Sequence, residues 1–464
     1  MARTPTPAPT AKDEREKSRR IGALAALTPF LGPYRWLMVA AAAALVMTAM
    51  ISLTLPLAVR RVIDNFGTGE TELLDQYFIA ALIIAGLLAV GTGLRYALVT
   101  RLGERVVADI RRAVFDRVIG MSPSFYERIM TGEVLSRITT DTTLILSVIG
   151  SSVSIALRNL LIFVGGLGLM LLTSAKLTGL VLLIVPAVVI PILTLGRRLR
   201  VLSRENQDWI AASSGNASET LGAVQTVQAF THETASRGQF AQMTEASFAA
   251  AQRRIKTRAA MTMIVIFLVF SGVVGVLWIG ARDVRADVMS AGALVQFVIY
   301  AVMVAGAVAA LSEIWGELQR AAGATERLVD LLQTEDSVKD PSADAQARLP
   351  DPVAGKITFE NVQFTYPARP DVAALDGINL VINPGETVAF VGPSGAGKTT
   401  IIQMILRFYD PQTGRITLDG VDLRDVARDH FRRAVALVPQ DPVIFAATLL
   451  RTSALAGPTP AMPR

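Results

Sequence analysis

Six long stretches of this sequence contain no Asp, Glu, Lys or Arg, and they constrain the possible folds more than any other feature. Most of them reach the roughly 20 helical residues that cross the hydrocarbon core of a membrane. The hydrophobic share of 52% is more than a soluble domain can bury. One such helix could be the core of a soluble protein, but six could not. The uncharged stretches are Trp36–Ala58, Tyr77–Leu94, Asn159–Ser174, Leu177–Gly196, Ala259–Ala281 and Met289–Ser312.

The distribution of basic residues predicts the orientation of these spans. With the N-terminus inside, the inner segments 1–35, 99–147 and 197–258 hold 23 Lys and Arg residues, and the outer loops hold 5. Cytoplasmic segments of membrane proteins carry this excess of positive charge. We therefore expect a multi-pass protein of the cell (inner) membrane with both termini in the cytoplasm. The net charge of +6 then reflects topology, and no nucleic acid is expected as a partner.

The N-terminal region offers two interpretations. Residues 1–20 begin with a Pro- and Thr-rich run and are predicted to be disordered. The following "KSRRIGALAALTPFLG" has the basic flank and short apolar run of a signal peptide. No clear small-residue cleavage site follows, and a full span starts a few residues later. An interfacial helix before the first span is the favoured interpretation.

The two inner connections, Thr100–Ile149 and Arg197–Arg258, are long, polar and poor in Gly and Pro. Apolar residues recur in them at helical spacing, as in "RVVADIRRAVFDRVIGM". We expect the membrane helices to continue into the cytoplasm and return as helical arms. A disordered loop is the alternative, and the periodicity disfavours it.

A glycine-rich loop near the C-terminus carries the chemistry. In "ETVAFVGPSGAGKTTIIQMILRFYD" the pattern G-x-x-x-x-G-K-[ST] is met by Gly392, Gly397, Lys398 and Thr399. The segment is expected to form a strand, a loop and a helix. Loop N–H groups and the helix dipole would bind phosphate oxygens, Lys398 would meet the β- and γ-phosphates, and the Thr399 hydroxyl would bind Mg²⁺. The expected ligands are ATP and Mg²⁺.

The predicted nucleotide contacts are Tyr366, Gly392, Ser394, Gly395, Gly397, Lys398, Thr399 and Thr400. Tyr366 ends a strand-like segment and could stack on a base, although from its position alone an ordinary strand tyrosine is an equal alternative. There is no cysteine, which excludes disulfides and thiolate metal sites, and the 2 histidines lie far apart in the sequence. A histidine-based metal site is therefore not expected.

The predicted organisation has five parts. It comprises a tail at 1–20, a six-helix transmembrane domain at 21–335, a linker at 336–355, the N-terminal part of an ATP-binding domain at 356–450, and a tail at 451–464. The spans are expected at about 36–58, 77–98, 150–174, 177–196, 259–281 and 289–312. The fold class is a multi-domain membrane protein: a six-helix transmembrane bundle with long cytoplasmic helical extensions, followed by a partial P-loop α/β domain.

This arrangement resembles a half-transporter of the ABC exporter family, of the multidrug and lipid type. The resemblance covers about Ala23 to Leu450 and rests on "FYERIMTGEVLSRITTDT", "ASETLGAVQTVQAFTHE", "FTYPARPDVAALDGINLVI", "GPSGAGKTT", "GRITLDGVDLRD" and "ALVPQDPVIF". It implies that Tyr366 stacks on adenine and that Gln440 is catalytic, contacting both Mg²⁺ and the attacking water. It also implies that Gly132–Thr142 and Ala217–Phe230 are coupling helices, which dock on the ATP-binding domains and transmit nucleotide-driven motion.

The resemblance further implies a partner and a cargo. Such proteins work as dimers, here a homodimer or a heterodimer with another ABC half-transporter, in a lipid membrane. ATP is held between the P-loop of one subunit and the signature sequence of the other. The cargo would be a small molecule or lipid, and the Ala-, Leu- and Val-rich spans suit an amphiphilic or apolar one. Arg158, Asn159, Ser271 and Gln296 could contact it, or could hydrogen-bond to neighbouring helices.

Three elements of the family pattern are missing from the sequence. There is no LSGGQ-like signature, no apolar run leading into an Asp-Glu pair, and no histidine after Gln440. All three belong after Leu450, where the sequence changes to "RTSALAGPTPAMPR". Read from the third base of the Arg451 codon, this tail permits a family-like continuation. A single-base frameshift is therefore our hypothesis, and a genuine short protein with a disordered tail is the alternative.

Three functions remain open at this point. The chain could be an ATP-driven export half-transporter by lineage, present as a copy that is deficient in hydrolysis. It could be a non-enzymatic membrane protein that binds nucleotide or an intact partner and regulates that partner. It could also be an unstable remnant without activity, because an ATP-binding domain without its aspartate strand would leave an apolar edge exposed.

Overall fold

The computed structural model describes residues 21–65 and 71–440. They divide into two compact units: one contains residues 105–146 and 319–440 with the turns before residue 34, and the other contains residues 34–104 and 147–318. The predicted tails at 1–20 and 451–464, and residues 441–450 of the predicted ATP-binding domain, lie outside the described residues.

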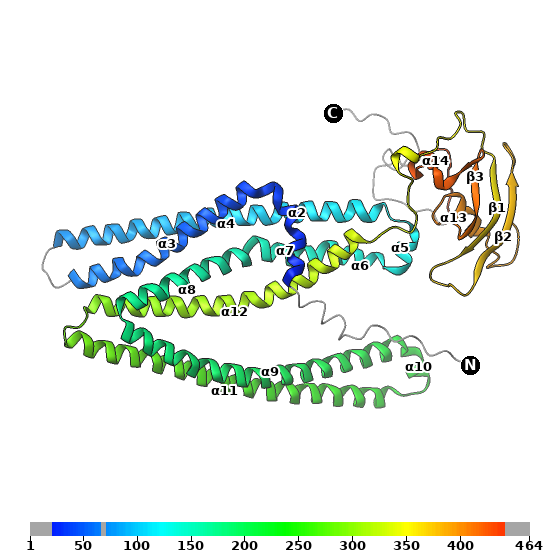
Figure 1. Cartoon of the computed structure of the whole chain (residues 1–464). Coiled ribbons are helices and arrows are strands. Elements are labelled where there is room, and N and C mark those ends of the chain that lie inside the picture. The colour runs from blue at the N-terminus through cyan, green and yellow to red at the C-terminus, as the bar shows by residue number, and fades with distance from the viewer. Residues whose placement is uncertain (1–20, 66–70, 441–464) are drawn as a thin grey trace. The chain divides into compact units, whose positions relative to one another are not determined.

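Six long helices carry the uncharged stretches, as predicted (Figure 1). Each is apolar and long enough to cross a membrane. Side chains such as Leu82, Leu172 and Trp278 are 75%, 85% and 69% exposed, which suits lipid and not water. The helices are α3 (Arg35–Asn65), α4 (Thr71–Ile119), α8 (Val153–Thr173), α9 (Ala175–Gly222), α11 (Glu233–Arg285) and α12 (Ala291–Gln333).

Close contacts at small residues hold the helices of the second unit together. A Cβ on Gly280 of α11 would overlap a methyl group of Leu294 on α12. This close approach is typical of helix packing in membranes. The hydrophobic effect does not drive helices together in lipid, so their association depends on close van der Waals contact at small residues. Tyr300, fully buried on α12, donates a hydrogen bond of 2.7 Å to the carbonyl of Leu53 on α3. A glycine and a buried hydroxyl group thus contribute to the helix contacts, beside a cluster of larger apolar side chains.

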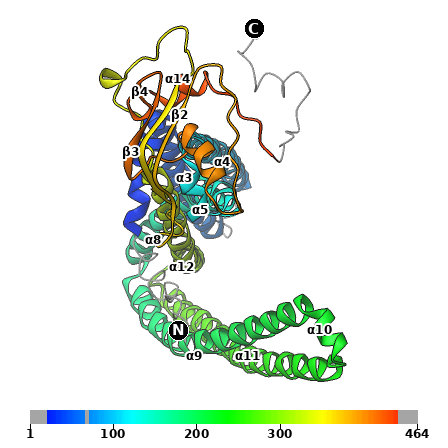
Figure 2. The same ribbon diagram turned by 90° about the vertical axis from the view of Figure 1, so that its right-hand side faces the viewer.

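The second predicted arm is a long helical hairpin. Helices α9 and α11 lie side by side over much of their length, and α10 (Val224–Ala229) joins them (Figure 2). An ion pair of 2.7 Å links Glu205 on α9 to Arg253 on α11. At the joining end, Leu221 and Phe230 are 71% and 76% exposed. The predicted continuation of the membrane helices beyond the uncharged stretches is therefore confirmed, and this hairpin presents an apolar tip.

The first arm turns at α5 (Pro123–Arg128) and returns through α6 (Thr131–Ser136) and α7 (Thr142–Ser147). Two π-helical turns, η3 (Arg137–Asp141) and η4 (Val148–Ser152), interrupt the return and continue into α8. In the first unit, the carboxylate of Asp141 accepts two hydrogen bonds from Arg327 of α12, at 2.6 and 2.9 Å. Wide π turns let a helix reorient side chains without breaking.

The structure corrects the expected position of the first coupling segment. The resemblance places it at Gly132–Thr142, but those residues contact α12, through Asp141 and Arg137. The residues that contact the ATP-binding part of the same unit are in and just before α5. The physical reason is the turn of the arm: the chain reverses between Gly120 and Pro123, so α5 is at its end and α6 is already returning.

The ATP-binding part contains a four-stranded antiparallel sheet in the order β2-β1-β3-β4 (Figure 1). Phe359 and Phe364 from β1 pack with Met404 and Phe431 from the two helices in one buried core. The alternation of apolar residues in β1 explains why one face of the sheet is covered. The elements are β1 (Ile357–Thr365), β2 (Ala373–Ile382), α13 (Lys398–Ile405), β3 (Thr413–Leu418), β4 (Val421–Asp422) and α14 (Arg428–Arg432).

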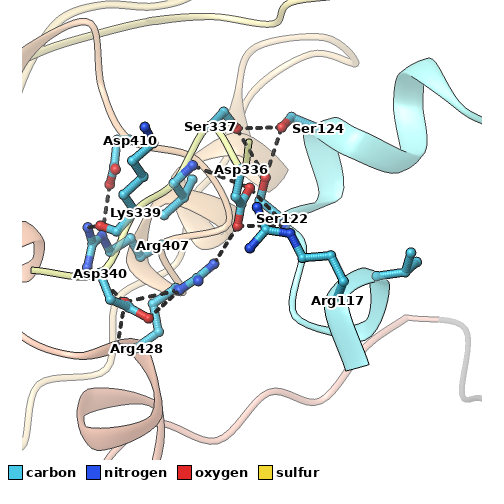
Figure 3. A network of polar contacts seen from close by, with 12 residues as sticks. Arg117, Ser122, Ser124, Asp336, Ser337, Lys339, Asp340, Arg407, Asp410 and Arg428 are labelled. Atoms are coloured by element: carbon cyan, nitrogen blue, oxygen red, sulfur yellow. Dashed lines mark hydrogen bonds and ion pairs between the residues drawn. The ribbon is translucent and has the colours of Figure 1, made fainter. Parts of the chain in front are cut away.

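The segment after α12, expected as a linker from residue 336, is packed at its start. Figure 3 shows Asp336 between the arm and the ATP-binding part. Its carboxylate accepts hydrogen bonds from the backbone N–H of Ser122, at 3.1 and 3.2 Å, and pairs with Arg428 at 2.9 Å. The hydroxyls of Ser122, Ser124 and Ser337 meet within 3.1 Å of one another. The composition of segment 336–355 did not predict this packing, because the residues that bind Asp336 lie far away in the sequence.

The Asp336 contacts predict a pH-dependent stability. Burial alone would raise the pKa of this carboxyl, but the hydrogen bonds from Ser122 and Arg428 outweigh it and lower the pKa. A lowered folded pKa stabilises the fold above the unfolded value, about 3.9, and this contribution is lost as pH falls through the folded pKa. We expect Asp336→Asn to cost about 2 kcal/mol at neutral pH, and the difference from wild type to shrink toward pH 3. Thermal unfolding in detergent across pH measures this.

Glu335→Gln is the matched control for Asp336→Asn. Glu335 is the neighbouring carboxylate, 73% exposed, and its partner Lys339 is on the same surface. Exposed pairs of this kind contribute little to stability. We expect its unfolding temperature to follow wild type at every pH. A destabilisation by Asp336→Asn that stayed constant from neutral pH to pH 3 would contradict the electrostatic explanation.

Candidate nucleotide-binding site

The glycine-rich loop leads directly into the N-terminus of α13, as the motif predicts. Gly392, Gly395 and Gly397 have φ angles of 154°, 87° and 83°. Residues with a Cβ rarely adopt these conformations, so the path of the loop requires glycine. A loop of this kind can direct successive N–H groups toward an anion, and the helix dipole adds positive potential at the same end.

Gly397 is also required by space. A Cβ at this position would lie 2.6 Å from the carbonyl oxygen of Ala374 and 3.1 Å from a methyl group of Leu375. Both residues belong to β2, so the end of the loop presses against the sheet. The loop is therefore held by the strand behind it and by its own conformation.

Lys398 is the first residue of α13, and its ammonium group lies over the loop. Its Nζ donates hydrogen bonds to the carbonyl oxygens of Gly392 and Pro393, at 2.9 and 2.8 Å. A phosphate that binds in the loop would draw the ammonium group away from these two carbonyls. Ser394, Gly395 and Thr399 are exposed beside it, where a phosphate or a metal ion could reach them.

Tyr366 follows β1, and its hydroxyl group bonds to the first turns of α13. The hydroxyl donates to Oε1 of Gln403 at 2.5 Å and lies 3.1 Å from Oγ1 of the buried Thr400. The structure thus brings the predicted aromatic residue and the P-loop helix together. This connection could not be predicted, because the two segments are more than thirty residues apart in the sequence.

A cavity of about 360 Å³ lies beside Tyr366. This volume is within the range of small-molecule sites. Its lining includes both polar and apolar side chains. The lining residues are Gln363, Thr365, Tyr366, Pro367, Pro370, Ala373, Leu375, Asp376 and Gln412.

Gln440 is not brought to the loop by any described contact. It is the last residue before the undescribed C-terminal segment, it is exposed, and it forms no hydrogen bond within the described part of the chain. Its predicted role at the metal ion and the attacking water stays a prediction. Thr399 is the other predicted Mg²⁺ ligand. Residues 21–65 and 71–440 contain no cluster of three His, Cys, Asp or Glu side chains suited to a metal. Protein-bound Mg²⁺ is usually held by one or two protein groups together with substrate phosphates and water.

The prediction of a strand directly before the P-loop is wrong, because the described structure has no strand there. Residues 387–391 and residues 435–439 have no assigned secondary structure and no sheet pairing within the described part of the chain. Val391 and Val438 are 89% and 92% exposed. A strand needs a neighbour to satisfy its N–H and C=O groups, and neither segment pairs with another described strand. Their composition favours a strand, but partners decide whether one forms.

Two residues near the site were not identified from the sequence. Tyr409 packs its ring against Phe364 and Tyr366, with centroid distances of 5.1 and 5.3 Å. Its hydroxyl donates a 2.5 Å hydrogen bond to Oε1 of Glu127 on α5. In the sequence, Glu127 is part of a family pattern that does not indicate this contact, and a buried tyrosine after a helix carries no signal of its own.

Six membrane-length helices joined in one chain to a P-loop domain define a multi-pass membrane protein with a loop of the kind that binds nucleotide phosphates. Two family models support a narrower statement. The ABC transporter transmembrane region matches residues 38–308, and the ABC transporter model matches residues 375–456. The chain belongs to the ABC transporter family.

Three relatives show the extent of the similarity. ABC transporter B family member 1 of Dictyostelium discoideum is 29% identical over 89% of this chain and 45% of its own length. The mitochondrial ATP-dependent permease MDL1 of Schizosaccharomyces pombe is 30% identical over 89% of this chain and 58% of its own. The ABC multidrug transporter mdr2 of Aspergillus fumigatus is 29% identical over 89% and 53%. The chain therefore spans about half the length of these relatives.

Proposed function

We propose that this chain is the membrane and nucleotide-binding part of an ATP-driven export half-transporter. The observation that carries the proposal is the P-loop at the start of α13, with Lys398 over its carbonyls, in the same chain as six membrane-length helices. Gly392, Ser394, Gly395 and Gly397 would hold the phosphates, and Tyr366 would stack on adenine. Thr399 and Gln440 would hold Mg²⁺, which neutralises phosphate charge when bound.

The functional unit would be a homodimer or a heterodimer with another ABC half-transporter in the cell (inner) membrane, with both termini cytoplasmic. The exposed apolar tip at Leu221 and Phe230 supports a partner, because a free surface of this kind is costly in water. The multidrug name of one relative supports a broad cargo class. Opening and closing of the dimer would alternate access to the two membrane faces.

The cargo would be an amphiphilic or apolar small molecule or lipid. Two of the polar residues in the spans form hydrogen bonds within the protein, which favours a structural role for them over contact with the cargo. Asn159 donates a 2.9 Å hydrogen bond to the carbonyl of Ile155 on its own helix. Gln296 accepts from Arg60 at 3.4 Å and donates to Thr173 at 3.5 Å. With these groups satisfied internally, the apolar side chains of the spans are the candidates for cargo contact.

We further propose a second candidate function, the regulation of an intact half-transporter through nucleotide binding. Hydrolysis needs groups that activate water and stabilise the transition-state charge, whereas nucleotide binding needs only the phosphate-binding loop that the structure describes.

ATP binding to the full chain in lipid nanodiscs tests the proposal. We expect Lys398→Ala to weaken binding of a fluorescent ATP analogue by about tenfold or more, because one charge-assisted phosphate contact is lost. Lys356→Ala is the control: it removes an exposed lysine of the same domain that lies outside the P-loop. Phosphate release measured on the same samples distinguishes the two candidate functions, because Lys398-dependent release supports export by ATP turnover and binding without release supports regulation. Equal affinities in wild type and Lys398→Ala would refute the assigned site.

A further inference from the structure

Tyr409 contacts both the candidate nucleotide site and the first arm. Tyr409 lies four residues after Ile405, the last residue of α13, and it is only 5% exposed. Its ring forms an aromatic cluster with Phe364 and Tyr366, and it meets Tyr366 edge to face at an interplanar angle of 81°. Interiors of this kind are close-packed, so a shift of one ring displaces its neighbours. A base that stacks on Tyr366 would therefore move Tyr409.

The hydroxyl group of Tyr409 continues the connection out of the core. It donates to the carboxylate of Glu127 on α5, 282 residues earlier in the chain. Burial and the Glu127 hydrogen bond raise the pKa of the Tyr409 phenol. The phenol is then protonated at every physiological pH and remains a donor. A donor to a carboxylate is among the stronger hydrogen bonds in proteins.

Helix α5 is fastened at its other contacts as well. The hydroxyl of Tyr126 donates to the carbonyl of Val118 in α4 at 2.9 Å, and the buried Phe125 packs edge to face on Tyr126 at 5.1 Å. Just before α5, the N–H of Ser122 donates to Asp336 (Figure 3). A displacement of Glu127 would consequently also displace the end of α4, because these contacts hold α5 firmly to it.

We propose that Tyr409 is a positioning residue that links base stacking on Tyr366 to α5 of the same chain through Glu127. The inference rests on the proposed function, because it needs ATP in the P-loop site. It predicts that the nucleobase, and not the triphosphate alone, controls the arm. Tyr366 is suited to linking the base to the arm, because its hydroxyl also hydrogen-bonds to Thr400 and Gln403 of α13.

Hydrogen exchange of residues 121–130 in the full chain in nanodiscs tests the link. We expect Mg-ATP to slow exchange there by about fivefold in wild type, as expected for one net hydrogen bond that becomes more persistent. In Tyr409→Phe, ATP affinity should stay within about twofold while the slowing disappears. Glu127→Gln keeps an acceptor oxygen and should retain most of the response, whereas Glu127→Ala should lose it.

Two comparisons make the test specific. Tyr126→Phe removes a phenol one residue from Glu127, so it should change the basal exchange and keep the ATP response. Inorganic tripolyphosphate should occupy the loop without slowing exchange at 121–130. Full slowing by tripolyphosphate, or an unchanged ATP response in Tyr409→Phe, would overturn the inference alone. Failure of wild type to bind ATP would overturn the proposed function and this inference together.

Discussion

Replacing Arg407 with alanine is expected to lower the free energy of unfolding of the ATP-binding part by about 3–5 kcal/mol. This arginine is only 2% exposed. Its guanidinium donates to Asp410 at 2.9 Å, to the carbonyl of Val426 at 3.0 Å and to the carbonyl of Lys339 at 2.8 Å. Removal would leave a carboxylate and two carbonyls without their donor and would open a cavity, and each effect is costly in a buried site.

Pulse proteolysis over a urea gradient, performed on the full chain in nanodiscs, measures this loss through the survival of the ATP-binding fragment. Arg433→Ala is the control. Arg433 is an exposed arginine whose ion pair with Asp429 is 3.9 Å long, with side chains 82% and 79% exposed. We expect its midpoint to match wild type, because such pairs add little. A similar midpoint for Arg407→Ala would show that the guanidinium is not a structural anchor.

Gly397→Val is expected to weaken ATP binding by about 100-fold or more. A residue with a Cβ is strained at the φ of 83° found there. The added atom would also lie 2.6 Å from the carbonyl of Ala374, a backbone atom that cannot move without moving β2. The loop would then shift away from the start of α13, and its N–H groups would lose their alignment toward the phosphates.

Equilibrium binding of a fluorescent ATP analogue, with circular dichroism as a check on folding, measures the Gly397→Val effect. Gly420→Val separates strain from position. Gly420 has a φ of 84°, but nothing lies within 4 Å of its hypothetical Cβ, and it is in the turn between β3 and β4. We expect this variant to be destabilised and to keep its ATP affinity. Equal losses of affinity in both variants would point to a general folding defect.

The helical framework was the most predictable part of the fold. Uncharged stretches such as Trp36–Ala58 and Ala259–Ala281 lie inside α3 and α11, because in lipid only an internally hydrogen-bonded helix satisfies the backbone. The spacing of apolar residues also predicted that the membrane helices continue into the cytoplasm, and α4 continues to Ile119. The π turns η3 and η4 were not predicted, since the helical periodicity of short apolar runs does not reveal one extra residue in a turn.

The site was predictable where chemistry is local. The P-loop residues from Gly392 to Thr399 carry their own conformation, and the structure places the loop at the start of α13. The strand before the loop was predicted wrongly, because its formation depends on neighbours that the local sequence does not contain. The bond between Tyr409 and Glu127 joins residues 282 positions apart, and no local pattern encodes it. The position of the first coupling segment was predicted wrongly for the same reason, because its contacts with the ATP-binding part join residues far apart in the sequence.

The π turns η3 and η4 have a mechanical consequence for the returning helix. Each accommodates one residue more than an ordinary α turn, and conversion of that turn to α form would advance the following residues by about 1.5 Å and rotate them by about 100°. Such a step keeps the helix continuous. A displacement at the end of the helix can therefore be converted into a combined rotation and translation about the helix axis. This motion changes which side chains face the neighbouring helices, and it adds to any rigid-body tilt of the helix.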